Sequence, residues 1–230
     1  MSLNRRVPKW AKLFAAILLL PVCIAAVSAL WRLLKHASTA GGGTDAFWIP
    51  LAAGAACWLV IYALLPRPMW IYVLGHELTH AVWTWFFLGR VKSMKVTSQG
   101  GHVKVTKENF LITLAPYFFP LYAGLAAVVY YLGRAAGGWS GPMALGAFHL
   151  ALGAAYAFHV TLTWHVLQIR QSDVTSQGTL FSVVIIFLGN ALVLMLALPL
   201  LTGNAPLSQV FGWWWQSLAA LGKWSWQQFQ

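Results

Sequence analysis

Six apolar segments set the fold class of this chain. Each is about 20 residues long, the length that a helix needs to cross a hydrocarbon core about 30 Å thick. The chain is 60% hydrophobic and 8% charged, whereas a soluble domain carries about 25% charged residues. The sequence therefore predicts an all-α polytopic membrane protein with about six transmembrane helices. The segments are residues 10–34, 47–65, 69–88, 110–132, 143–167 and 180–201.

The first segment also fits a signal peptide. Arg5, Arg6 and Lys9 precede an apolar stretch that ends in a small-residue site at residues 27–29. A signal core is about 7 to 15 residues long, and this stretch, at about 25 residues, exceeds it. We therefore expect an uncleaved helix.

The net charge of +11 has a source other than nucleic-acid binding. The cations lie in short loops beside apolar segments, where Lys and Arg act as topology signals and contact anionic lipid headgroups. We therefore expect the lipid bilayer as a partner and no nucleic acid. A short multispanning chain without an organelle signal suits the bacterial cytoplasmic membrane, so we expect a multi-pass protein there.

Two parts of the chain depart from the apolar pattern. Between the third and fourth segments, two short β-branched runs surround Gly100 and Gly101, which predicts a small β-hairpin over residues 91–106 with a Gly-Gly turn. At the other end, residues 206–230 are rich in Trp among Gln, Ser and Lys. Indole rings prefer the membrane interface, so this region predicts an interfacial helix.

The third segment carries His76, Glu77 and His80. Each ionisable side chain near the bilayer centre costs about 2.5 to 3.5 kcal/mol, so three together need a compensating role. The two histidines are four residues apart and lie on one helix face, where both can bind one Zn²⁺. Zinc lowers the pKa of a bound water toward about 7, and Glu77 would act as general base. The motif predicts a hydrolytic site with one Zn²⁺ per chain.

A catalytic zinc needs a third protein ligand. Asp173 is our first choice, since it is the one carboxylate after the fourth segment and lies between the fifth and sixth. The alternative role for Asp173 is an N-cap for the last helix. His159 and His165 compete for the third position, or lie in a second shell around the ligands.

The chain resembles the site-2 protease family of intramembrane zinc metallopeptidases. The resemblance rests on the motif from Gly75 to His80 in a membrane helix, on residues 89–91 leading into the hairpin, on the proline-bearing segment 114–120 and on the late Asp173. It covers residues 69–201. One element differs: Asp173 is followed by Val174, where the family has an Asp-Gly step.

The sequence contains no internal repeat and no low-complexity linker, so we expect one membrane domain over residues 1–230. Within it, residues 10–65 form N-terminal helices, residues 66–201 form the metalloprotease-like core and residues 206–230 form an interfacial tail.

The resemblance also implies an activity: hydrolysis of a peptide bond in or near a transmembrane helix of a membrane-protein substrate. His76, His80 and Asp173 would hold the zinc, and Glu77 would carry the proton. The hairpin would pair with the unwound substrate as an added strand. The alternative is a catalytically inactive membrane scaffold or regulator with the same fold. The residues expected to pair with the substrate are Val91, Val96, Gly100, Gly101, Val103 and Val105.

Overall fold

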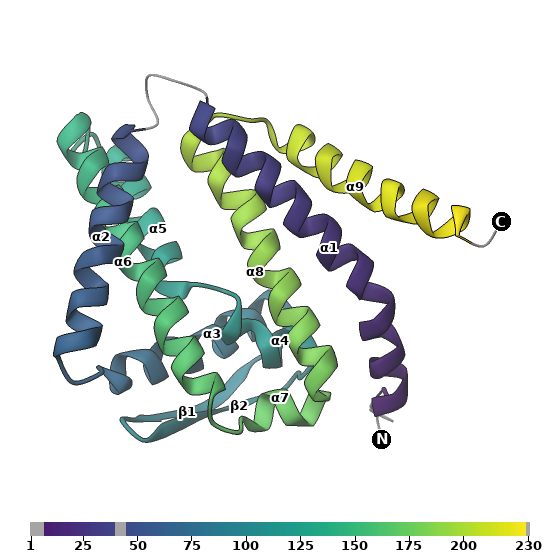
Figure 1. Cartoon of the computed structure of the whole chain (residues 1–230). Coiled ribbons are helices and arrows are strands. Elements are labelled where there is room, and N and C mark those ends of the chain that lie inside the picture. The colour runs from purple at the N-terminus through teal and green to yellow at the C-terminus, as the bar shows by residue number, and fades with distance from the viewer. Residues whose placement is uncertain (1–6, 40–44, 229–230) are drawn as a thin grey trace. The chain divides into compact units, whose positions relative to one another are not determined.

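Helices make up most of the chain in the computed structural model, which describes residues 7–39 and 45–228 (Figure 1). One two-stranded antiparallel sheet accompanies them within these residues. The predicted helical class with a small hairpin is confirmed. Arg5 and Arg6, on which the signal-peptide alternative partly rests, lie outside the described residues.

The chain forms two compact units. The terminal unit falls within Met1–Gly41 and Arg170–Gln230, and the central unit within Gly42–Ile169. The terminal unit contains α1 (Lys9–Thr39), α7 (Ser172–Gln177), α8 (Thr179–Thr202) and α9 (Leu207–Gln227). The central unit contains α2 (Asp45–Leu64), α3 (Met69–Phe86), β1 (Val91–Thr97), β2 (Gly100–Val105), α4 (Phe110–Leu114), the 3-10 helix η1 (Ala115–Tyr117), α5 (Leu121–Ala135) and α6 (Pro142–Leu167).

Four helices of the described chain, α1, α2, α6 and α8, are long and apolar enough to cross a membrane. The number rises to five if the bent pair formed by residues 110–117 and α5 counts as one span. This agrees with a membrane protein. Helix α3, which carries the histidine motif, is not among these helices, so the predicted count of six spans stays a prediction.

The predicted membrane segment over residues 110–132 is not a single helix, and its crossing of the membrane as one span stays a prediction. The structure has α4 and η1, then a break, then α5, with a bend of 80° between the two parts. Pro116 and Pro120 explain the break, because a proline has no backbone N–H to donate and its ring clashes with the preceding turn. The bend places residues 110–117 against α3, where the histidines lie.

The central unit is held together by close helix packing between α2 and α6. A Cβ at Gly54 would lie 1.9 Å from the carbonyl oxygen of Leu150, and a Cβ at Gly153 would lie 1.9 Å from that of Leu51. Only glycine permits backbones to approach so closely, as in other membrane helix pairs. The Trp58 indole also donates a hydrogen bond to Thr161 Oγ1 at 2.8 Å, which links the two helices.

The hairpin is present, but its turn differs from the predicted one. Ser98 and Gln99 form the turn, and the two glycines begin β2, with Gly101 opposite Val96. Gly100 follows the turn with φ +148°, a conformation that residues with a Cβ rarely adopt. Gly100 therefore permits the backbone conformation after the turn, and Gly101 permits the close approach of β2 to Glu77.

The terminal unit packs α8 and α9 against α1. Its core is built from small and aliphatic side chains such as Ala26, Leu33 and Met195. The Trp214 indole donates a hydrogen bond to the Val22 carbonyl at 3.1 Å, which ties α9 to α1. Helix α9 diverges from α1 toward the C-terminus (Figure 1). The predicted helix in the Trp-rich region is present, and its location at the membrane interface stays a prediction.

Candidate metal centre

Helix α3 presents the two motif histidines to each other. It begins after Pro68 and contains no internal proline, so its hydrogen-bonding continues through the motif. The imidazole centroids of His76 and His80 are 5.0 Å apart and the rings are nearly perpendicular. The spacing of four residues thus has the consequence predicted from helix geometry.

His80 is held in one tautomer by the backbone of α4. Its Nδ1 lies 2.8 Å from the carbonyl oxygen of Ile112. A carbonyl can only accept, so Nδ1 carries the proton and donates it. The lone pair of His80 is therefore on Nε2, which is the form in which a neutral imidazole binds a metal.

Asn109 positions the carbonyl that holds His80. Its side chain accepts a hydrogen bond from the Ile112 backbone N–H at 2.8 Å and so caps α4. Its own carbonyl accepts a hydrogen bond from the Thr113 hydroxyl at 2.9 Å. The cap fixes the first turn of a helix only five residues long, and thereby the place of Ile112.

Glu77 is buried between α3 and the hairpin. Its side chain is only 5% exposed. A Cβ at Gly101 would lie 2.8 Å from Glu77 Cγ and 2.9 Å from Oε1, so the β2 backbone lies directly against this side chain. Removing a carboxylate from water costs several kcal/mol unless a cation or donor groups surround it. A divalent cation bound by the neighbouring histidines would offset that cost.

Aromatic side chains enclose His76. The Tyr117 ring of η1 meets it edge-on at 5.2 Å between centroids, and Tyr72, one turn earlier on α3, lies at 6.0 Å. Tyr122 packs on Gly75, where a Cβ would lie 2.6 Å from its ring, and donates a hydrogen bond to the Ile71 carbonyl at 2.6 Å. These contacts restrict the motion of His76 and of the turn before it.

A small cavity borders His76 within the central unit. Its volume is about 20 Å³, and its walls come from α3, from residues 116–122 and from α6. His159 contributes an imidazole from α6, and Phe158 and Phe119 contribute aromatic rings. The structure therefore brings His159 to the same cavity as His76. His80 and Glu77 do not line it.

The remaining predicted site residues have different positions. Asp173 lies in the first turn of α7, in the terminal unit, and the N-cap positions of α7 and α8 are Gln171 and Gly178. The N-cap alternative for Asp173 is therefore wrong. Its role as third ligand stays a prediction. His165 lies in the last turn of α6 and does not line the cavity around His76.

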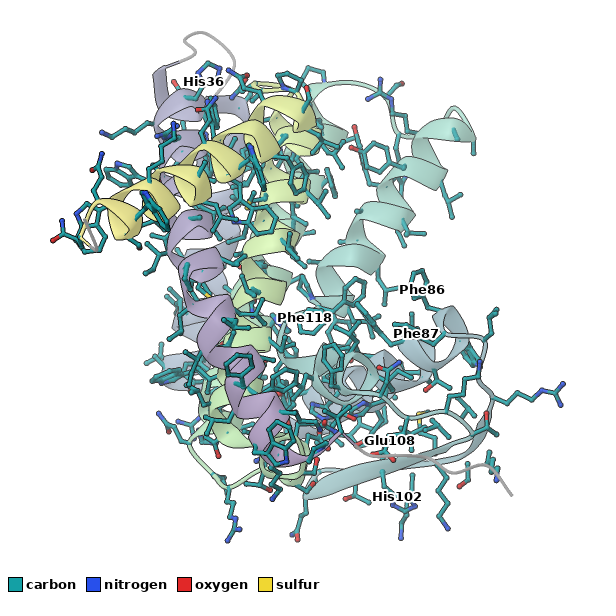
Figure 2. All side chains as sticks on the ribbon, turned by 90° about the vertical axis from the view of Figure 1, so that its right-hand side faces the viewer. His36, Phe86, Phe87, His102, Glu108 and Phe118 are labelled. Atoms are coloured by element: carbon teal, nitrogen blue, oxygen red, sulfur yellow. The ribbon has the colours of Figure 1, made fainter. Side chains whose placement is uncertain are left out.

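The predicted substrate-pairing residues lie on both strands of the hairpin. Val96 packs against the core of the central unit, which includes Tyr72 and Phe158. Val91, Val103 and Val105 are half-buried, whereas the exposed His102 points away from the hairpin (Figure 2). Among the glycines, Gly101 lies against Glu77, and Gly100 has open space around it.

Three residues that shape the centre are not among the residues predicted from the sequence. Asn109 had a detectable signal, because an Asn before an apolar run is a typical N-cap. Ile112 acts through its backbone carbonyl, and Gly101 acts by lacking a Cβ, so neither has a side chain that indicates its role. Such residues emerge only when the elements that carry them are brought together.

Comparison of the chain with protein-family models, curated proteins and solved structures gives no match.

Proposed function

We propose that this protein is a zinc-dependent endopeptidase that cleaves a peptide bond in or near a transmembrane segment of a membrane-protein substrate. The observation that carries the proposal is the hydrogen bond from His80 Nδ1 to the Ile112 carbonyl. It is the partner that a metal-binding histidine characteristically has on its second nitrogen. A histidine that merely joined two helices would not need Glu77 buried on the same turn of α3.

The donor set fits zinc. Two neutral imidazoles from one helix turn and one carboxylate from elsewhere form a known catalytic ligand set, and we propose His76, His80 and Asp173 for these places. When bound, zinc would activate a water and polarise the scissile carbonyl. The site-2 protease family, which the chain resembles, gives the same assignment.

Glu77 would accept the proton of the attacking water and deliver it to the leaving amine. Its position between α3 and β2 supports this role, because Gly101 restricts the carboxylate to one side. Burial also keeps bulk water from competing as a proton donor. The surrounding aromatic rings contribute by holding the motif helix in place.

The hairpin would bind the substrate. A transmembrane substrate is helical, so its peptide bonds must be unwound before hydrolysis. A two-stranded sheet leaves one edge of each strand without a partner strand, and an extended peptide can pair there through backbone hydrogen bonds. Because β2 lies against Glu77, a peptide paired with this hairpin would pass near the general base.

The ligand assignment is tested by zinc content. We would measure zinc per chain by elemental mass spectrometry on detergent-purified protein, for the wild type and for His80→Ala, Asp173→Ala and His165→Ala. We expect one zinc per chain in the wild type, loss with His80→Ala, sharp reduction with Asp173→Ala and no change with His165→Ala. Loss of zinc with His165→Ala would make His165 the third ligand in place of Asp173. A wild type that holds no zinc after reconstitution would refute the metal site.

The activity is tested separately with Glu77→Gln. This variant keeps the size of the side chain and removes its basicity, so we expect zinc content to stay at the wild-type level. Cleavage of single-span reporter proteins in proteoliposomes should fall by at least about 100-fold, the contribution expected of a general base. A wild type that binds zinc and cleaves none of a broad reporter set would favour the inactive-scaffold alternative.

A further inference from the structure

His159 is a buried group that the proposed mechanism does not use. It projects from α6 and is 8% exposed. Its Nε2 has no hydrogen-bond partner among the described residues. Burying such a nitrogen without a partner costs about 1 to 3 kcal/mol, so its position calls for an explanation.

The cavity beside His76 explains how the buried His159 nitrogen can have a hydrogen-bond partner. Its volume of about 20 Å³ suits a single water molecule, which needs at least about 10 to 15 Å³ and two to four polar partners. His76 and His159 both line it, and so does Thr79. The Thr79 hydroxyl donates to the Gly75 carbonyl at 2.7 Å, and its oxygen can still accept.

A metal-binding histidine is characteristically oriented by a hydrogen bond on the nitrogen that faces away from the metal. For His80 the structure contains this interaction, with Ile112 as the partner. For His76 the structure contains the cavity, whose wall includes His159. A water in this cavity would lie beside both imidazoles, and it is the partner that we assign to the His159 nitrogen.

We propose that His159 is a positioning residue for the metal ligand His76, acting through one water bound in the cavity that the two imidazoles share. This inference rests on the proposed function, because it assumes that His76 binds zinc. In this arrangement His159 contacts the water and not the metal, because His80, the proposed second ligand, does not line the cavity.

The experiment compares zinc affinity, measured by competition with a chromophoric chelator in detergent, between the wild type and two variants of His159. His159→Phe keeps an aromatic ring and removes both nitrogens. His159→Gln places an amide nitrogen near the position of Nε2 and can still bind a water. His149→Phe is the matched control. His149 is another buried histidine on α6, with Nδ1 3.1 Å from the Ala46 carbonyl, and it does not line the cavity.

We expect His159→Phe to bind one zinc per chain at saturation with an affinity reduced by about 10- to 100-fold, the usual effect of losing an outer partner. His159→Gln should recover most of this loss, and His149→Phe should leave affinity unchanged. Wild-type affinity in His159→Phe would overturn the proposal. Complete loss of zinc in both His159 variants would overturn it too, by making His159 a ligand. Absence of zinc in the wild type would refute the proposed function itself. The titration of the wild type tests this independently of the His159 variants.

Discussion

The backbone of Gly101 lies against the side chain of Glu77. A Cβ at this glycine would come within 2.9 Å of both Cγ and Oε1 of the glutamate, closer than such atoms approach in proteins. The two residues belong to different elements, β2 and α3, that are separated in sequence by the whole of β1. The contact therefore joins the predicted substrate-binding hairpin to the predicted general base.

The first prediction concerns this contact. Gly101→Ala should displace either β2 or the Glu77 carboxylate, because the added methyl group would lie 2.8 Å from both Glu77 Cγ and the Lys95 carbonyl oxygen of β1. A displacement of about 1 Å at a catalytic group can cost about 100-fold in rate, so we expect a loss of that order in cleavage of a reporter substrate, with zinc content retained.

Gly124→Ala is the control for this variant, because a Cβ at Gly124 on α5 meets no atom within 4 Å. It should cleave the reporter at the wild-type rate. Unchanged cleavage in Gly101→Ala would show that the close contact with Glu77 is not needed for activity.

The second prediction concerns the cap of α4. Asn109→Ala removes the acceptor for the Ile112 N–H, which should destabilise this turn by about 1 kcal/mol. Because the Ile112 carbonyl holds His80, zinc affinity should also fall. Asn109→Asp keeps an acceptor at the cap and should retain most of the affinity. A chelator competition assay on both variants measures the effect. If both variants bind zinc with the wild-type affinity, the cap of α4 does not affect the metal centre.

The third prediction concerns the α2–α6 contact. Gly54→Ala and Gly153→Ala each place a methyl group 1.9 Å from a carbonyl oxygen, so the helices must separate. Overpacking of this kind typically costs about 1 to 3 kcal/mol. We would measure unfolding in mixed micelles with increasing denaturing detergent. Gly146→Ala lies on α6 with open space at its Cβ and should be neutral or stabilising by up to about 1 kcal/mol, from helix propensity alone.

The fourth prediction concerns two neighbouring tryptophans on α9. Trp214→Phe removes the indole N–H that donates to the Val22 carbonyl, and should lower the free energy of unfolding by about 1 kcal/mol. Trp215 is 70% exposed, so Trp215→Phe replaces an indole that is mostly outside the packed interior and should have little effect. If both variants unfold alike in detergent, the hydrogen bond to α1 does not stabilise the terminal unit.

The sequence determined the class of the protein and the local geometry of its motif. Long apolar runs indicate helices, because a backbone in hydrocarbon must satisfy its own hydrogen bonds. Helical periodicity placed His76 and His80 together, and the β-branched runs indicated the hairpin. Predictions from local sequence patterns were wrong at two places in the chain. The local pattern predicts Gly101 in the turn, whereas the structure has it in β2, and it predicts one helix over residues 110–132, which the prolines break.

The tertiary structure decided what surrounds the motif. The Ile112 carbonyl fixes the tautomer of His80, Gly101 admits the backbone beside Glu77, and His159 reaches the cavity beside His76. None of these relationships has a sequence signal, because a carbonyl is present in every residue and a missing Cβ matters only when another atom approaches it. A histidine among apolar residues is likewise equally compatible with a helix contact, with binding a metal, or with a hydrogen bond that orients a metal ligand. Sequence periodicity thus predicts which groups share one helix, whereas contacts between distant elements determine the chemistry available to them.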